Sequence, residues 1–219
     1  MLFDGSKDTI VSVAEMRAAD AYTIASGTPS KELMFRAATG VFDSYDGWEN
    51  GRTAIFCGSG SNGGDGYALA LILKDHGCEA DVFLTSSKFS EDGRYYYEKC
   101  VAAGIWCRPF EPAVTDLSRC GAIVDCMLGT GFKGFPRAPI SDAIAAINEA
   151  RRVGAFVISV DINSGMNGDT GEAELAVASD LTVSIGFLKT GFFRGRADEL
   201  IGRLVNTDIG IVLPPDGHC

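Results

Sequence analysis

Short apolar runs alternate with amphipathic segments along most of the chain. The runs with the length and composition of buried strands lie at 53–57, 80–85, 105–107, 122–127 and 155–161. Helical spacing of apolar residues between them predicts helices over 66–76, 91–103 and 139–154. Strands that alternate with helices in this way form parallel sheets with helices on both faces. The pattern therefore predicts an α/β fold with a mostly parallel sheet.

Two helices are expected before the first strand. Ser12 and Glu15 have the spacing of a capping box at the start of a helix over 13–26, and a second helix follows Pro29. We assign both helices to packing or to a dimer contact rather than to catalysis.

The tail of the chain predicts two further strands, at 181–185 and 203–211, which extend the sheet at one edge. An irregular glycine-rich segment that includes Lys189 separates them. No repeat, low-complexity block or linker interrupts the pattern, so we expect one domain over residues 1–219.

Composition narrows the classes of partner. A formal net charge of −10 argues against a general nucleic-acid surface or an anionic membrane surface, because both partners require basic patches. No apolar run is long enough to span a bilayer, and the N-terminus lacks the basic start and apolar core of a signal peptide. Seven cysteines, an odd number without a C-x-x-C pair, indicate reduced and buried thiols. We therefore expect a cytoplasmic protein without membrane or nucleic-acid partners.

The segment GSGSNGGDG at 58–66 lies between an apolar strand and an amphipathic helix. Gly58, Gly60 and Gly63 satisfy the G-x-G-x-x-G pattern, in which backbone amides at a helix N-terminus bind phosphate. Asp65, however, places a carboxylate where a pyrophosphate would lie. The second strand also ends without the acidic residue that holds the ribose of a redox NAD cofactor. The pattern indicates a phosphate-binding loop and disfavours an NAD-dependent dehydrogenase.

Ligands of such sheets bind beyond the carboxyl ends of the strands, and three glycine-rich loops lie there: 61–66, 128–135 and 162–171. Asp125 precedes the second loop and lies in an apolar strand, so its carboxylate requires hydrogen bonds or a cation. Together with Asn62 and Ser164 it offers hard oxygen ligands with one negative charge, which suits a monovalent ion. A turn cap made by Asp125 is an equally good explanation.

Asp161 precedes the third loop, and a partly desolvated aspartate there has the raised pKa that a general acid or base needs. A turn cap is again the alternative. Lys133 and Lys189 lie among glycines and aromatic residues, so either could neutralise a phosphate, although loop lysines are most often only solvated.

Four segments together, GSGSNGGDG, VDCMLGTGFKG, VDINSGMNGDTG and ASDLTVSIGFLKTGF, resemble the YjeF N-terminal family of NAD(P)H-hydrate epimerases. The runs EMRAAD and LMFRAATG resemble the opening helices of that family. The resemblance implies a three-layer α/β/α Rossmann-like fold. It also implies interconversion of the R and S epimers at the hydrated C6 of NADHX and NADPHX, the damaged forms of the reduced nicotinamide nucleotides, with no hydride transfer.

The resemblance also assigns residues. Asn62, Asp125 and Ser164 match potassium ligands, and Asp161 matches a substrate contact to which we assign the proton transfer. The other substrate-contacting positions are Ser61, Asn62, Gly63, Gly64, Asp65, Gly129, Thr130, Gly131, Phe132, Lys133, Gly134 and Phe135. The chain departs from the family pattern at Ser61, where the family has asparagine, and at Asn163, where it has proline.

Two other functions remain open from the sequence. Related domains serve as non-catalytic binding or scaffold modules, but a scaffold does not need Asn62, Asp125, Ser164 and Asp161 at the strand ends. An ordinary nucleotide-dependent oxidoreductase is the other. The resemblance further implies a homodimer, and the length of the chain leads us to expect that the dehydratase which repairs the S epimer is a separate protein.

Overall fold

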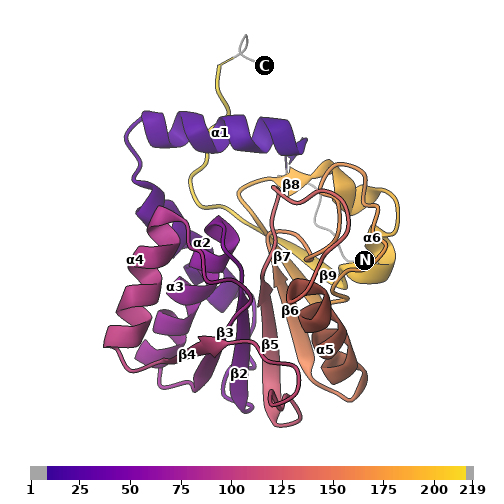
Figure 1. Ribbon diagram of the computed structural model, residues 1–219. Coiled ribbons are helices and arrows are strands. Elements are labelled where there is room, and N and C mark those ends of the chain that lie inside the picture. Colours follow the sequence, from indigo (N-terminus) through magenta and orange to yellow (C-terminus); the bar gives the residue numbers. More distant parts are fainter. Residues whose placement is uncertain (1–8, 216–219) are drawn as a thin grey trace.

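A parallel sheet of seven strands forms the centre of the computed structural model, which describes residues 9–215 (Figure 1). The strand order is β4-β3-β2-β5-β6-β7-β9, and every neighbouring pair is parallel. The strands are β2 (Arg52–Cys57), β3 (Ala80–Leu84), β4 (Trp106–Pro109), β5 (Cys120–Cys126), β6 (Phe156–Val160), β7 (Leu181–Ile185) and β9 (Arg203–Thr207). The order reverses beside β2, where the chain crosses from β4 to β5, so a ligand site is expected at the carboxyl ends of β2 and β5.

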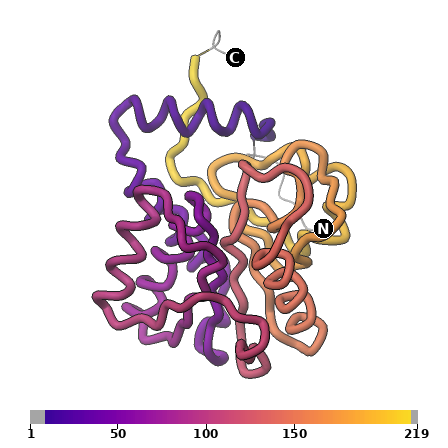
Figure 2. The backbone as a smooth tube through the Cα atoms, in the orientation of Figure 1, coloured from indigo at the N-terminus to yellow at the C-terminus, as the bar shows by residue number. Residues whose placement is uncertain are grey.

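Helices cover both faces of this sheet, as Figures 1 and 2 show. The helices are α1 (Val13–Ala25), α2 (Ser30–Asp43), α3 (Ser61–Asp75), α4 (Glu91–Ala102), α5 (Ile140–Arg152) and the short α6 (Ala197–Leu200), with a 3-10 turn η1 (Thr190–Phe193). Alternation along β2 divides the core: Ile55 and Cys57 pack with α2, α3 and α4, whereas Ala54 and Phe56 pack with α5. The predicted three-layer α/β/α fold with two N-terminal helices is confirmed.

The largest difference from the predicted elements is at the glycine-rich segment. Helix α3 begins at Ser61 rather than at residue 66, so the segment predicted as a loop is the first turn of the helix. The sequence predicts the later start, at residue 66, because glycine has a low helix propensity. In the structure, close packing decides: a Cβ at Gly58 would lie 1.9 Å from the Met127 carbonyl oxygen, and one at Gly63 would lie 2.1 Å from that of Gly58.

The remaining differences are small. The last strand, β9, ends at Thr207 rather than at residue 211, and the expected strand at 105–107 is β4. A second sheet, in which β1 (Ile10–Val11) pairs with β8 (Leu188–Lys189), was not predicted. Strands of two residues are too short to show a periodic pattern, and β1 and β8 are far apart in the sequence.

Helix α1 lies across the end of the sheet and does not belong to either of its covering layers (Figure 1). The predicted capping box is present: the Ser12 amide donates to Glu15 Oε2 at 2.7 Å, and the Glu15 amide donates to Ser12 Oγ at 3.2 Å. The chain after β9 returns beside α1, where the Val212 amide donates to Thr23 Oγ1 at 2.9 Å (Figure 2). The capping box thus stabilises the start of the helix, and the chain after β9 is bonded to its last turns.

The described cysteines are less uniformly buried than the sequence predicted. The six cysteines within residues 9–215 are free; Cys57, Cys100 and Cys126 are buried and the other three are partly buried. Cys219 and the N-terminal residues 1–8 lie outside the described residues. Over the described range, no helix has both the length and the apolar character that a membrane crossing demands.

Candidate functional site

A cavity of about 710 Å³ opens where the carboxyl ends of the strands meet α1. Its walls come from α1, α2, the first turns of α3, the segment 127–133 after β5, and Asp161 after β6. This is the edge at which an open parallel sheet binds its ligand. Two of the three segments selected from the sequence line it directly; the third, 162–171, contributes no lining residue, but Asp161 immediately before it does.

The N-terminus of α3 opens onto this cavity. The N-cap residue is Gly60, which has no side chain to cap the helix, and a Cβ built on it would meet nothing within 4 Å. Gly60, Ser61 and Asn62 all line the cavity. A helix N-terminus without a capping side chain has free amides and a partial positive charge, which suit an anionic group such as phosphate.

The other predicted substrate contacts divide into two groups. Asp65 and the residues 129–133 line the cavity. Gly63 and Gly64 do not: Gly63 packs against the Gly58 carbonyl, and a Cβ at Gly64 would lie 2.4 Å from the Met34 side chain. Gly134 and Phe135 also lie outside the lining, and the Phe135 side chain is 53% exposed. The structure therefore brings together the first part of the second loop but not its end.

Asp161 is held in a special conformation at the end of β6. It follows the last strand residue, Val160, with a φ of 67°, a value uncommon for a residue other than glycine. Its amide donates to the Val183 carbonyl at 2.8 Å. Such a conformation costs free energy and is found most often at functional sites, where surrounding contacts hold it.

A buried lysine pairs with Asp161. The Nζ of Lys189, fully buried, donates to Asp161 Oδ1, to Ser184 Oγ at 3.1 Å and to the Ile185 carbonyl at 2.8 Å. All three ammonium protons are thus used. Lys189 therefore compensates the charge of Asp161 and does not neutralise a phosphate, the role considered from the sequence. Lys133, in contrast, is exposed and lines the cavity.

Two further carboxylates line the same cavity, Asp65 from α3 and Asp20 from α1. Burial raises the pKa of Asp65 well above its usual range, and the negative charges of Asp161 and Asp20 add to this effect. Burial also raises the pKa of Asp20 to about 6, with a further contribution from Asp161, while Lys189 acts in the opposite direction. Within residues 9–215 neither carboxylate forms an ion pair of its own. The site therefore combines a charge-compensated carboxylate with two that bind protons more tightly than usual.

Asn62, Ser164 and Asp125 belong to one hydrogen-bonded chain. Asn62 Nδ2 donates to the carbonyls of Leu128, at 2.7 Å, and Val160, at 3.0 Å. The Leu128 amide donates to Ser164 Oγ at 2.9 Å, and that hydroxyl donates to Asp125 Oδ1 at 2.5 Å. These bonds fix the Asn62 amide, and its Oδ1 is buried without a hydrogen-bond partner in the described part of the protein.

Asp125 lies inside β5 and caps the following turn, which was one of the two explanations left open. It accepts from the Met127 amide at 3.2 Å, the Ser164 amide at 2.8 Å and Ser159 Oγ at 3.1 Å. Burial raises the pKa of Asp125, and these hydrogen bonds act against that change. Together with the Ser164 hydroxyl these donors occupy about all four acceptor positions of the carboxylate, so a cation that binds Asp125 would replace one of them.

The donor set fits a monovalent cation. An unpartnered buried amide oxygen, a serine hydroxyl and one carboxylate are hard oxygen ligands with one negative charge. Over residues 9–215, no group of three or more His, Cys, Asp or Glu side chains could hold a metal ion, so a site rich in charged ligands has no support there.

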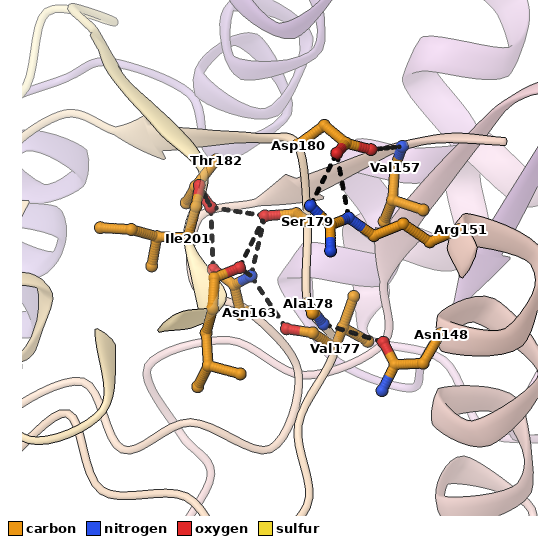
Figure 3. Close-up of polar contacts among 11 residues, drawn as sticks. Asn148, Arg151, Val157, Asn163, Val177, Ala178, Ser179, Asp180, Thr182 and Ile201 are labelled. Carbon is orange, nitrogen blue, oxygen red and sulfur yellow. Dashed lines mark hydrogen bonds and ion pairs between the residues drawn. The ribbon is translucent and has the colours of Figure 1, made fainter. Parts of the chain in front are cut away.

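Asn163, the departure from the family pattern beside Ser164, is fully buried in a polar network (Figure 3). Its Nδ2 lies within hydrogen-bond distance of the carbonyls of Val177 and Leu200 and of Ser179 Oγ. Its Oδ1 accepts from Thr182 Oγ1 at 2.9 Å. The network links the segment after β6 to β7 and to the end of α6, so side-chain hydrogen bonds hold this segment in place of the rigidity of a proline.

Sequence reasoning missed the contribution of α1. Met16, Arg17, Asp20 and Ile24 line the cavity, and Arg17 Nη2 donates to the Thr130 carbonyl at 3.2 Å. Packing or dimerisation alone is therefore not a sufficient role for this helix. A signal was present: Asp20 lies four residues after Met16, and a carboxylate next to the buried stripe of Met16, Ala19 and Thr23 has a cost that a structural helix would avoid.

Residues 30–191 match the family model described as YjeF-related protein N-terminus. The NAD(P)H-hydrate epimerase of Limosilactobacillus reuteri (strain DSM 20016) is 32% identical over 209 residues, which are 90% of this chain and 94% of that protein. The Bifunctional NAD(P)H-hydrate repair enzyme Nnr of Archaeoglobus fulgidus is 37% identical over 180 residues, 82% of this chain but 37% of that protein.

The chain thus spans about two fifths of the length of the bifunctional relatives. The crystal structure of a yeast protein, ynu0, superposes with a TM-score of 0.76 at 20% identity, covering 87% of this chain and 86% of that one, and supports the fold. With three quarters of its length matched by the family model and full-length relatives above 30% identity, the chain belongs to the YjeF-related protein N-terminus family.

Proposed function

We propose that this protein is an NAD(P)H-hydrate epimerase, an isomerase that interconverts the R and S forms of NADHX and NADPHX at C6. The observation that carries the proposal is the cavity that joins the uncapped N-terminus of α3 to the Asp161–Lys189 ion pair. The cavity has a phosphate-binding end and a proton-transfer end, and both lie at the carboxyl ends of the strands. The names of full-length and bifunctional relatives support the same activity.

Binding of the nucleotide follows from the walls of the cavity. The amides at Gly60 and Ser61 and those of the segment 129–133 hold the pyrophosphate, since both segments line the cavity and are rich in glycine. Lys133 adds a positive charge at the same wall. The hydrated nicotinamide ring then lies over the ends of β5 and β6, within reach of Asp161.

Asp161 carries the proton transfer in this proposal. The Lys189 ammonium compensates its charge, and the carboxylate lines the cavity, where it serves as the base. No hydride acceptor or donor is needed, because the substrate and product differ only in configuration at C6.

A potassium ion is proposed at Asn62, Asp125 and Ser164. The unpartnered Asn62 Oδ1 is the observation that supports it, because a buried amide oxygen without a donor is costly unless a cation binds there. A bound potassium ion would supply positive charge near the pyrophosphate, whereas the protein residues hold and orient the loops.

We infer two partners. A homodimer is supported by exposed apolar side chains at the N-terminal helices, such as Tyr22 at 38%, Ile24 at 44% and Phe35 at 47% exposure. Light scattering of the purified protein tests it, and a monomer at micromolar concentration would overturn it. A functional link to an NAD(P)HX dehydratase is supported by the relatives that are named bifunctional repair enzymes.

The proposed activity is tested with separated R and S epimers of NADHX, followed by chromatography. The wild-type protein is expected to interconvert them, and Asp161→Asn is expected to lose about 10²- to 10⁴-fold in kcat, the usual contribution of a proton-transfer group. Asp75→Asn removes the same charge at the exposed end of α3 and serves as the matched control. Absence of interconversion by the folded wild type, or a change of NADH absorbance with common redox substrates instead, would overturn the proposal.

A further inference from the structure

The first turns of α1 are fixed to the same segments that hold the proposed site. In the β1–β8 pair, Val11 lies in register with Lys189, the lysine that pairs with Asp161. The Val13 amide donates to Asp169 Oδ1 at 2.7 Å, in the loop that follows Asp161. The start of the helix is therefore positioned by the ion pair's own neighbours.

Asp20 lies two turns along this helix and lines the same cavity as Asp161. The two carboxylates come from different elements of the lining: Asp161 follows β6, and Asp20 lies on α1, the helix that crosses the end of the sheet (Figure 1). They are close enough that the charge of Asp161 affects the proton affinity of Asp20. A planar ring bound between α1 and the ends of the strands would have one of these elements on each face, and each element carries one carboxylate.

Epimerisation by loss and return of a hydroxyl requires proton transfer on both faces of the ring. The hydroxyl leaves from one face with a proton from an acid, and water returns from the other face and gives its proton to a base. A single carboxylate on one face can serve only one of these steps well, because proton transfer requires hydrogen-bond distance to the reacting oxygen.

We propose that Asp20 is a second catalytic residue of this enzyme and transfers the proton on the face of the nicotinamide ring opposite Asp161. The inference rests on the proposed epimerase function and extends it to α1. In one direction Asp20 is the acid and Asp161 the base; in the other direction the roles exchange, as microscopic reversibility demands.

The step balances with water as the only co-reactant. The Asp20 carboxyl proton goes to the C6 hydroxyl, the C6–O bond breaks with its electron pair on oxygen, and water leaves. The N1 lone pair forms the N1=C6 double bond of an iminium ion. Water then adds to C6 from the other face, the iminium electrons return to N1, and Asp161 takes the proton. Exchange with solvent moves that proton back to Asp20.

The surroundings of the two carboxylates differ. Lys189 pairs with Asp161 directly. The groups that share the cavity with Asp20 are Arg17 from α1, Asp65 from α3, Asp92 from α4, Lys133 from the 127–133 segment, and Asp161. Burial and Asp161 together raise the pKa of Asp20 to about 6, near the value that suits an acid at neutral pH. Two carboxylates in different environments, one of them paired with a lysine, suit the separate roles of acid and base.

The test measures epimer interconversion in both directions from pH 5 to pH 8 for the wild type, Asp20→Asn and Asp20→Glu. In the wild type, kcat/KM for the direction in which Asp20 is the acid falls as the pH rises through about 6, because Asp20 must be protonated to donate. Asp20→Asn is expected to lose about 10²-fold in kcat with KM changed less than about threefold, and to lose this alkaline limb. Asp20→Glu keeps a carboxyl group and retains the limb with a shifted midpoint. Asp75→Asn, at the exposed end of α3, matches the change in charge and leaves both parameters unchanged.

The outcomes distinguish a failure of the role proposed for Asp20 from a failure of the proposed function. If Asp20→Asn keeps kcat within about threefold of wild type, or loses activity through KM alone, the inference is wrong and the proposed function stands. If Asp20→Asn does not fold, as thermal unfolding would show, Asp20→Glu decides: an alkaline limb identical to that of the wild type refutes a role for Asp20. If the folded wild type does not interconvert the epimers, the proposed function itself fails.

Discussion

Replacing Asn163 by alanine tests whether the buried polar network holds the segment after β6. The change removes an amide whose Nδ2 lies 2.9 to 3.1 Å from Ser179 Oγ, the Val177 carbonyl and the Leu200 carbonyl. It also removes the acceptor of Thr182 Oγ1, 2.9 Å away. The side chain is fully buried, so solvent does not replace these partners readily (Figure 3).

The magnitude follows from which partners remain paired. An amide has two N–H donors and a carbonyl oxygen, so about three hydrogen bonds are lost, at about 1 kcal/mol each. The Leu200 carbonyl keeps the Ser179 amide at 2.8 Å, whereas the Val177 carbonyl loses the donor that Asn163 gives it. The expected loss in the free energy of unfolding is therefore about 3–4 kcal/mol, a lowering of Tm by roughly 6–16 °C for a chain of this size.

Urea unfolding followed by circular dichroism measures the loss directly. Asn148→Ala is the matched control, because that amide also makes two hydrogen bonds, to the Ala176 carbonyl and from the Ala178 amide, but is only half-buried. It should cost about 1–2 kcal/mol. A double-mutant cycle of Asn163→Ala with Thr182→Val should give a coupling of about 1 kcal/mol. A loss below about 1 kcal/mol for Asn163→Ala, with no coupling, would refute the reasoning.

Three further predictions concern a tightly packed glycine, the proposed potassium ion and the titration of Asp20. Gly58→Ala places a Cβ 1.9 Å from a backbone oxygen and should lower the unfolding free energy by about 3 kcal/mol or more, whereas Gly60→Ala, with open space around it, should change it by less than about 1 kcal/mol in the same thermal melts. The wild type should melt higher in potassium chloride than in tetramethylammonium chloride, and Ser164→Ala should abolish the difference; equal melting of the wild type in both salts would contradict the proposed ion. Because the folded-state pKa of Asp20 is raised from 3.8 to about 6, its carboxylate destabilises the fold above pH 6, and this penalty disappears as the pH falls toward 4. The unfolding free energy measured in urea should therefore rise less between pH 7 and pH 5 in Asp20→Asn than in the wild type, and equal slopes would show that Asp20 titrates normally.

The sheet and its two covering layers could be predicted because each element carries its own periodic signal. Where the prediction failed, a tertiary contact decided the local structure. The first turn of α3 contains residues of low helix propensity, and the close approach of Gly63 to the Gly58 carbonyl and of Gly64 to the Met34 side chain explains why glycines are needed inside this helix.

The candidate site was predictable where it depends on strand ends. Asp161, Asn62 and Asp125 were selected because carboxyl ends of parallel strands meet at one edge, and the structure places Asp161 and Asn62 on the cavity wall with Asp125 buried behind it. The pairing of Lys189 with Asp161 and the approach of Asp20 could not be predicted in the same way. Both depend on β1 pairing with β8, a contact between segments that are distant in sequence and too short to show a pattern.

Helix α1 forms one wall of the cavity but lies outside the region that the family model matches. The matched region begins at residue 30, after α1. It therefore contains most of the central sheet but not Arg17 or Asp20. A chain shortened to the matched region would lack one wall of the cavity, and its proposed nicotinamide subsite would open to water. A comparison restricted to the matched region therefore leaves out Arg17 and Asp20, which line the cavity.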